Sequence, residues 1–407
     1  MDKIARLPYG ISLTTLLTII LVLWPLNVLS GVSFGQKILY ILFPIICLVF
    51  AIILTKGSIK VSPKIFLLVL FFIGFDFIGL ILKFHSLTLN TVLEYVRPLI
   101  NSTLLISAFC IGKATKIDAP KLRKILNTVL LICVIFIFLQ LVVPDNPIIK
   151  SVSPRTIFGN LGIWIGGPFI WSYSFGVFLL IIYSMYLFDV FNGKSMRFQI
   201  LVFTIIIFLM IFTQSKAVYL SAMFITLLAV VYKCSYRLNT LFLKRLILLL
   251  TAITVLCVYI FLEHLENLGN IARFVNFLIT REVDASTASR LAQLEKIHLV
   301  TFVDWLFGAP STGYEIENTY GYKLVNFGLL GVTTLLLQLT FIFLIALKMF
   351  RWVPASEYFA FFALSVSLPI FMLGSIPLDG PKIGYLVILL IGFWVASYEN
   401  VKWQVEE

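Results

Sequence analysis

Four polar clusters interrupt an otherwise apolar chain, and they hold the side chains best suited to chemistry. The clusters are residues 153–167, with Arg155, Asn160 and several glycines; Thr213-Gln-Ser-Lys216; Ser289-Arg290; and Glu317-Asn-Thr-Tyr320. Three of them contribute a cation, and the last contributes a carboxylate. Preorganised cations stabilise negative charge that develops during a reaction, and a carboxylate can accept a proton. Together the clusters could bind an anionic group and supply a base.

The last two clusters lie in an unusually long polar stretch, residues 281–331. This stretch carries Arg, Lys, His, Asp and Glu side chains, whereas most of the other connections are short. Function concentrates in loops that a rigid scaffold holds in place, and gathered titratable groups mark candidate sites. We therefore interpret this stretch as the part of the chain that carries much of the chemistry.

The usual signatures of soluble enzymes are absent. The sequence has no glycine-rich phosphate loop, no Asp-x-Asp sugar-nucleotide motif, no His-Glu-x-x-His and no Gly-x-Ser-x-Gly. Its three histidines, His85, His264 and His298, are too dispersed to predict a metal site. The cysteines indicate neither a disulfide framework nor a thiolate site. We expect no metal and no cofactor, and a substrate that arrives through the membrane.

The composition is that of a helical membrane protein. The 407 residues are 60% hydrophobic and only 12% charged, and the mean hydropathy is +1.05. Soluble domains are about 25% charged. The net charge of +12 would suggest nucleic acid in a soluble chain, but here the basic residues lie in loops between apolar runs. We expect the bilayer as a partner and no nucleic acid, in a single integral-membrane domain over residues 1–407.

Runs long enough to cross a bilayer of ~30 Å occur about twelve times. They cover approximately 10–30, 38–55, 65–82, 92–112, 124–143, 162–190, 198–213, 216–233, 245–263, 322–348, 356–374 and 382–398. The first run is too long for a signal-peptide core and has no cleavage site after it, so it is predicted to stay as a membrane helix. The fold class is therefore an all-α polytopic membrane protein with about 12 transmembrane helices.

The distribution of Lys and Arg predicts the orientation. Placing both termini inside puts most of the 31 basic residues on the cytoplasmic side, as the positive-inside rule requires. Residues 264–321, between helices nine and ten, then form one large extracytoplasmic loop. Within it, 271–278 has the spacing of a surface amphipathic helix. A second helix is predicted from 286–287 to about 306, with Arg290, Leu294 and His298 on one face.

These motifs, in this order, resemble those of the Wzy-type O-antigen polymerases and the wider O-antigen ligase superfamily. The arginine–glycine loop is matched by Arg155-Thr-Ile-Phe-Gly159-Asn160-Leu-Gly162, the hairpin by Thr213-Gln-Ser215-Lys216-Ala217, and the start of the outer helix by Ser289-Arg290. The closing pattern is matched by Phe307-Gly308, Glu317-Asn318-Thr319-Tyr320 and Gly328-Leu-Leu-Gly331. The resemblance spans most of the chain, because helix number, topology and the outer loop agree as well.

The resemblance implies metal-independent glycosyl transfer between undecaprenyl-diphosphate-linked glycans on the periplasmic face of the bacterial inner membrane. The leaving diphosphate needs cations, for which Arg155, Arg290 and Lys216 are candidates, and the attacking sugar hydroxyl needs a base, for which Glu317 is the candidate. Candidate substrate-binding residues beside Lys216 are Asn318, Tyr320, Tyr314, His298 and Asn160. The resemblance also implies a partner protein that regulates chain length.

Two departures and several alternatives remain. Ligases of this superfamily usually have His before Asn in the closing motif, so Glu317 favours a polymerase, and Ala309-Pro310 replaces a usual glycine. An O-antigen ligase and a lipid-linked oligosaccharide flippase stay open, although a flippase usually has internal repeats that this chain lacks. Each candidate also has a structural interpretation, as an interfacial anchor, an exposed ion pair or an aromatic of the membrane belt.

Overall fold

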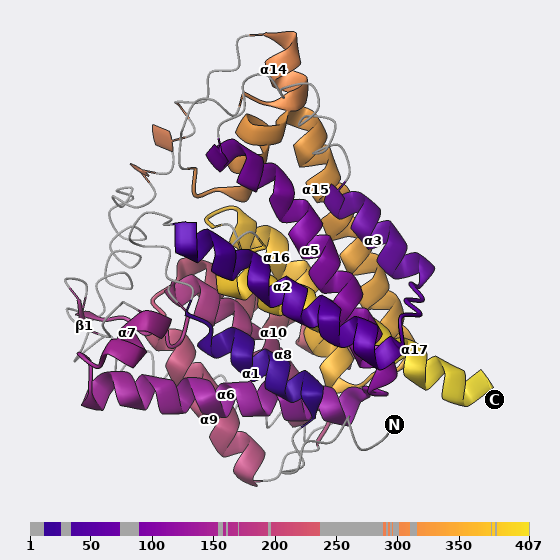
Figure 1. The fold of residues 1–407 in the computed structure, drawn as a ribbon. Coiled ribbons are helices and arrows are strands. Elements are labelled where there is room, and N and C mark those ends of the chain that lie inside the picture. The colour runs from indigo at the N-terminus through magenta and orange to yellow at the C-terminus, as the bar shows by residue number, and fades with distance from the viewer. Residues whose placement is uncertain are drawn as a thin grey trace.

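The computed structural model describes most of the chain as helix (Figure 1). The described residues are 12–25, 34–73, 89–153, 158–159, 162–169, 171–193, 197–236, 288–289, 292–293, 295, 301–309, 316–375, 377–378 and 381–406. Two strands of two residues each form a small antiparallel hairpin.

The helices follow the apolar runs. They are α1 (Leu13–Leu23), α2 (Phe34–Thr55), α3 (Pro63–Ile73), α5 (Leu89–Ala114), α6 (Ala119–Val142), α7 (Pro147–Val152), α8 (Ser172–Phe191), α9 (Arg197–Phe212), α10 (Lys216–Tyr236), α14 (Phe302–Phe307), α15 (Thr319–Trp352), α16 (Ser356–Met372) and α17 (Pro381–Glu406). The strands β1 (Phe158–Gly159) and β2 (Gly162–Ile163) precede α8. The predicted all-α class is confirmed.

Five helices of the described part are long and apolar enough to cross a membrane. They are Ala119–Val142, Ser172–Phe191, Lys216–Lys233, Thr319–Trp352 and Lys382–Lys402. Four shorter apolar helices, Leu13–Leu23, Ile41–Thr55, Phe198–Phe212 and Ser356–Met372, accompany them. The predicted run 245–263 and most of the predicted loop 264–321 lie outside the described residues. The structure therefore supports a helical membrane protein without fixing the number of spans.

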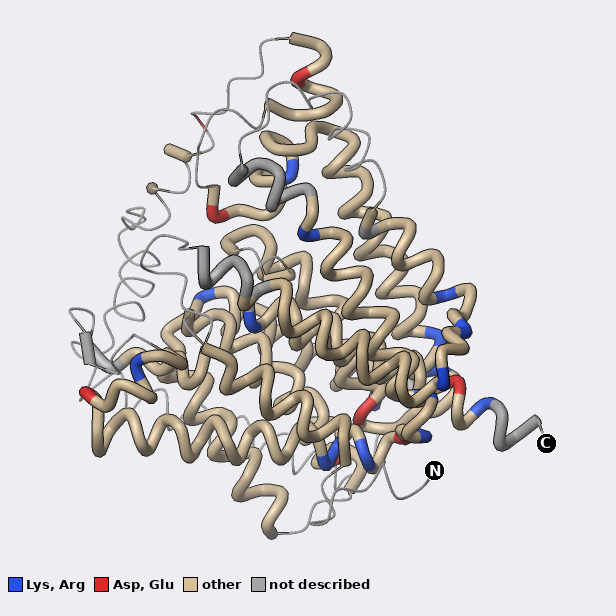
Figure 2. The backbone as a smooth tube through the Cα atoms, viewed as in Figure 1, with Lys and Arg blue, Asp and Glu red and all other residues tan. Residues whose placement is uncertain are grey.

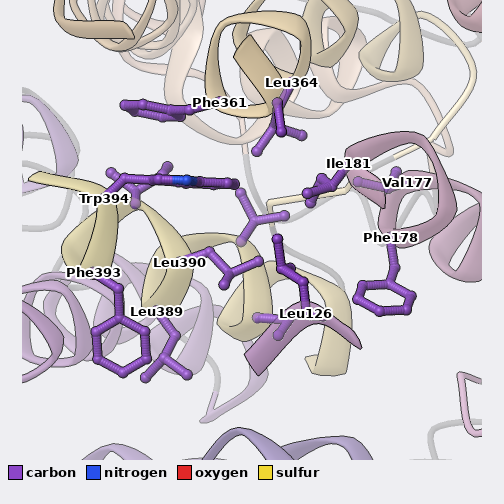
Figure 3. Close-up of a cluster of buried hydrophobic side chains, with 14 of the residues drawn as sticks. Leu126, Val177, Phe178, Ile181, Phe361, Leu364, Leu389, Leu390, Phe393 and Trp394 are labelled. Atoms are coloured by element: carbon purple, nitrogen blue, oxygen red, sulfur yellow. The ribbon is translucent and has the colours of Figure 1, made fainter. Parts of the chain in front are cut away.

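The helices α8 and α17 form the centre of the bundle. Both are apolar around their whole circumference and almost entirely buried, as expected of helices that neighbours surround on every side. Figure 3 shows the contact between α16 and α17, in which Phe361 of α16 lies over Trp394 of α17. Their ring centroids are 4.8 Å apart, and the planes of the two rings are nearly parallel. Because lipid is as apolar as these side chains, close packing rather than burial from water stabilises the contact.

Small residues let α5 and α17 approach closely. A Cβ added at Gly112 would lie 2.7 Å from the Cβ of Ala396, and one added at Gly392 would lie 2.6 Å from the Cβ of Ala108. Ala108 and Gly112 are four residues apart on α5, as are Gly392 and Ala396 on α17, so each helix presents its two small residues on one face. This is the small-residue interface typical of membrane helices.

The outward surface of the bundle is apolar. Phe198 of α9 and Met223 of α10 are 70% and 71% exposed, and Phe138 of α6 is 62% exposed. A soluble monomer rarely carries exposed apolar surface on this scale. These side chains are suited to contact with lipid, which supports the membrane assignment.

Polar contacts join helix ends in two groups. In the first group, Arg123 of α6 lies 2.8 Å from the carboxylate of Asp189 at the end of α8 and 2.6 Å from that of Glu357 at the start of α16. Both carboxylates are almost fully buried. Lys233 at the end of α10 donates to Asn192, 2.8 Å away, beside the same end of α8. Figure 2 shows charged residues gathered toward helix ends, with mostly uncharged residues along the helices between them.

The first group also includes the ends of α3, α5 and α17. Lys64 at the start of α3 lies 3.5 Å from Glu399 near the end of α17. Asn400 donates to the carbonyls of Gly112, in the last turn of α5, and Ile117, just after that helix. The predicted topology assigns every one of these ends to the cytoplasmic side. Contacts at the opposite ends of α8, α10, α15, α16 and α17 form the second group, where Lys216 and Glu317 lie.

Two sequence predictions differ from the structure, and one short helix was missed. The run 162–190 is not one helix, because β2 occupies 162–163, residues 164–169 and 171 are non-helical, and α8 begins at Ser172. Gly167 has a positive φ of 55°, and Pro168 follows it. The second helix of the outer loop does not run unbroken to 306. Thr301 is non-helical and caps the separate helix α14. The short helix α7 was not predicted.

Candidate active site

The hairpin tip between α9 and α10 is a tight, mostly buried turn. Thr213 and Gln214 are buried, and Gln214 has a left-handed φ of 50°. The Thr213 hydroxyl donates to the carbonyl of Met210 at 2.7 Å, and the Tyr219 hydroxyl donates to that of Ile211 at 2.6 Å. These bonds close the turn and place Lys216, half-buried, as the first residue of α10.

The glycine-rich loop before α8 packs against this tip. The indole of Trp164 donates to the carbonyl of Thr213 at 3.0 Å and also bonds the hydroxyl of Ser172. The backbone N–H of Ile165 donates to the carbonyl of Phe212 at 3.0 Å. The first and second sequence clusters, which are about fifty residues apart in the chain, are therefore parts of one structural unit.

A buried lysine that the sequence analysis missed fastens the same loop to α17. Lys382 is only 3% exposed. Its ammonium donates to the carbonyl of Val152 at 2.6 Å and to that of Pro168 at 2.9 Å. Within the described residues it pairs with no carboxylate. Because Val152 and Pro168 bracket the loop that carries Arg155 and Asn160, Lys382 closes that loop at its base.

The fourth cluster contacts the chain just after the third cluster. The backbone N–H of Glu317 donates to the side-chain oxygen of Gln293 at 3.1 Å. Gln293 lies in a helical part of the chain, as do residues 288–289 shortly before it. The side chain of Glu317 is exposed and stands just before the N-terminus of α15, where the helix dipole favours negative charge. The carboxylate thus faces outward from a fixed backbone position.

Asn318 and Tyr320 use their polar atoms to hold α15 against the end of α16. Asn318 caps α15 by accepting from the N–H of Gly321 at 3.1 Å, and its amide donates to the carbonyl of Leu373 at 2.9 Å. The Tyr320 hydroxyl donates to the carbonyl of Pro369 at 3.3 Å. These contacts give both residues a structural role. Their predicted binding of sugar stays a prediction.

The connection between α16 and α17 anchors both halves of the candidate site. Its first residues accept hydrogen bonds from the fourth cluster, through Leu373 and through Ser375, whose carbonyl accepts from Thr319 at 2.6 Å. Lys382, directly after it, holds the loop of the first cluster. The two halves, far apart in sequence, are therefore positioned by one short segment, 373–382.

Two glycines interlock the outer loop with α15. A Cβ on Gly328 would lie 2.3 Å from the carbonyl carbon and oxygen of Leu306, and one on Gly308 would lie 2.4 Å from the backbone of Asn326. The N–H of Ala309 donates to the carbonyl of Val325 at 2.6 Å. Gly328 interrupts α15 with φ 66° and ψ −163°. This close contact between the backbones at 306–309 and 325–328 explains why the closing motif has glycine at both positions.

The remaining candidates lie outside the described residues; they are Arg155, Asn160, Arg290, His298 and Tyr314. In the part of the chain that the structure describes, no three His, Cys, Asp or Glu side chains are grouped to hold a metal ion. No model of a known protein family matches the chain, and no curated protein matches it either. The assignment of function therefore depends on the motifs and on the geometry that joins them.

Proposed function

We propose that this chain is a membrane glycosyltransferase of the O-antigen polymerase type, which joins undecaprenyl-diphosphate-linked oligosaccharide repeats on the periplasmic side. The observation that carries the proposal is the set of contacts between the segments that hold the motif clusters. The loop of the first cluster bonds the hairpin of the second, and Gln293, just after the third cluster, accepts from the backbone N–H of Glu317 in the fourth. Segment 373–382 anchors both pairs. A common site is the simplest reason for this arrangement.

The proposed reaction is one displacement at the anomeric carbon of the donor sugar. A hydroxyl oxygen of the acceptor glycan forms the new glycosidic bond as the bond from that carbon to the diphosphate oxygen breaks. The hydroxyl proton passes to Glu317, and undecaprenyl diphosphate leaves with the bonding electron pair. Arg155, Arg290 and Lys216 stabilise the negative charge on the departing diphosphate, which suits the bidentate geometry of arginine.

The other candidates position the two glycans. Asn160, His298 and Tyr314 are proposed to contact sugar hydroxyls or ring faces, together with Asn318 and Tyr320. The proposed setting is the bacterial inner membrane, with cytoplasmic termini, about twelve helices and the 264–321 loop over the site. A chain-length regulator protein is the proposed partner.

A deletion strain separates this proposal from its alternatives. Loss of a polymerase should leave lipopolysaccharide capped by a single repeat, whereas loss of a ligase or a flippase should remove O-antigen from the core altogether. Complementation by the wild-type chain serves as the control. A strain without any capped core would overturn the polymerase assignment.

A purified system tests the residues. We expect the reconstituted chain to lengthen a defined lipid-linked repeat in the presence of a metal chelator, with products resolved on a gel. Glu317→Gln should lower the rate by ~10²–10⁴-fold, because a positioned base contributes that much. Glu295→Gln, an exposed carboxylate of the same outer loop, should not. Full-length polymer from Glu317→Gln, or a strict need for divalent metal, would contradict the proposed mechanism.

A further inference from the structure

An apolar groove with lysines at its rim lies at the opposite end of the bundle from the candidate site. Its walls are Phe341, Leu344, Ile345 and Met349 of α15, with Tyr398 of α17, and its volume is about 190 Å³. Lys64 of α3 and Lys348 of α15 complete the lining. Three helices that are far apart in sequence thus build one groove.

Positive charge exceeds negative charge around this groove. Lys64 lies 3.5 Å from Glu399 and 4.7 Å from the centre of the Tyr398 ring. Lys348 is exposed and makes no ion pair within the described residues. Burial lowers the pKa of Lys64 and Glu399 raises it, while Lys348 and Lys402 lower it further. Lys348 and Lys402 therefore both repel the charge on Lys64, whose only ion-pair partner within the described residues is Glu399, and a bound anion would relieve that repulsion.

Aromatic residues beside the groove are of the kind that gathers where a membrane meets water. Trp352 packs edge-on against Tyr398 with ring centroids 5.2 Å apart, as aromatic residues of the interfacial belt do. Leu344 is 52% exposed and continues the apolar wall along α15, away from Lys348. A ligand that fits has an anionic end beside Lys64 and Lys348 and a hydrocarbon part along α15.

We propose that this groove binds an anionic phospholipid of the surrounding leaflet, with its phosphate between Lys64 and Lys348 and an acyl chain along Phe341 and Leu344. Basic pockets between membrane helices have the chemistry to hold anionic headgroups. The site is independent of the proposed glycosyl transfer, because none of its residues belongs to the four motif clusters.

The test measures lipid retained by the full-length protein. The chain is purified, exchanged into vesicles of phosphatidylcholine with phosphatidylglycerol, re-extracted, and analysed for bound lipid by native mass spectrometry. We expect phosphatidylglycerol to be retained over phosphatidylcholine. The double variant Lys64→Gln/Lys348→Gln should lower its apparent affinity by about 25-fold, because each lysine near an anionic lipid contributes about fivefold.

Three further variants keep the outcome decisive. Lys60→Gln/Lys124→Gln removes two exposed lysines of the same end outside the groove and should leave retention unchanged. Lys64→Arg/Lys348→Arg keeps the charges and should keep the lipid. Leu344→Trp fills the groove while keeping the lysines, so it should weaken lipid retention even if the glutamine variant fails to fold. Equal retention of both lipids, an equal loss in the Lys60/Lys124 variant, or displacement of the lipid by inorganic phosphate would overturn the proposal.

Discussion

Replacing Gly328 by alanine should destabilise the protein strongly, because two separate costs meet at this position. Its φ of 66° and ψ of −163° lie in a region that residues with a Cβ hardly occupy, at a cost of ~1–3 kcal/mol. The added Cβ would also lie 2.3 Å from the backbone of Leu306, and forcing apart such a contact costs ~1–3 kcal/mol more. The expected loss is therefore about 2–6 kcal/mol.

Two other glycines separate these costs. Gly57 has a positive φ of 77° but nothing within 4 Å of an added Cβ, so Gly57→Ala measures backbone strain alone. A Cβ on Gly112 meets the Cβ of Ala396 at 2.7 Å without a positive φ, so Gly112→Ala measures crowding alone. Gly328→Ala should lower the stability by more than either control.

The assay is the apparent melting temperature in detergent at one fixed heating rate, because a membrane protein of this size unfolds irreversibly. Gly308→Ala should behave like Gly328→Ala, since its Cβ would strike the other side of the same crossing. The double variant Gly308→Ala/Gly328→Ala should lower the stability by less than the sum of the two single variants, because both substitutions disrupt the same backbone contact. If Gly328→Ala melts no lower than Gly57→Ala, the backbone crossing between α14 and α15 is not as described.

Three more perturbations test the two groups of helix ends. Arg123→Met leaves two buried carboxylates without their cation, so it should lower the stability of the protein by about 3–5 kcal/mol. Thermal unfolding measures this, with the exposed Arg351→Met as the control. Equal melting temperatures for the two variants would count against the buried network. Lys382→Met should speed hydrogen exchange in residues 153–168 without the same effect from Lys150→Met, as measured by mass spectrometry; unchanged exchange would mean that the lysine does not close the loop. Trp164→Phe removes a hydrogen bond to the hairpin tip and should lower stability by about 0.5–1.5 kcal/mol, and unchanged melting would argue against that contact.

The sequence predicted the helices well where an apolar run ends at a polar turn. The pair α9 and α10 shows this, because Thr213-Gln-Ser215 is too polar to stay in lipid and too short for anything except a tight turn. The prediction failed at 162–171 because Trp164, Ile165 and Phe169 are as apolar as a membrane helix. Hydropathy does not register that glycine and proline free the backbone there to pack on the hairpin.

The pairing of the motif clusters could be proposed but not located from the sequence. Lys382 illustrates the reason, since a lysine just before an apolar run reads as an interfacial anchor. Its acceptors are the backbone carbonyls of Val152 and Pro168, 230 and 214 residues away, and a carbonyl has no sequence signature. Asn318 and Tyr320 also bond carbonyls, so motif residues that look like ligands for sugar in the sequence also hold helices together.

The two groups of helix ends constrain how the chain crosses the membrane. The helix α6 begins in one group, at Arg123, and its far end leads into α7 in the other; its 24 residues separate them by about 36 Å. By the same contacts α10 ends in the first group, through Lys233, and α15 begins in the second, through Asn318. With the two groups on the sides that the predicted topology gives them, we predict an odd number of membrane crossings between these two helices. The single run predicted at 245–263 would supply one such crossing, whereas an even number of crossings would be inconsistent with the end of α10 and the start of α15 lying in different groups.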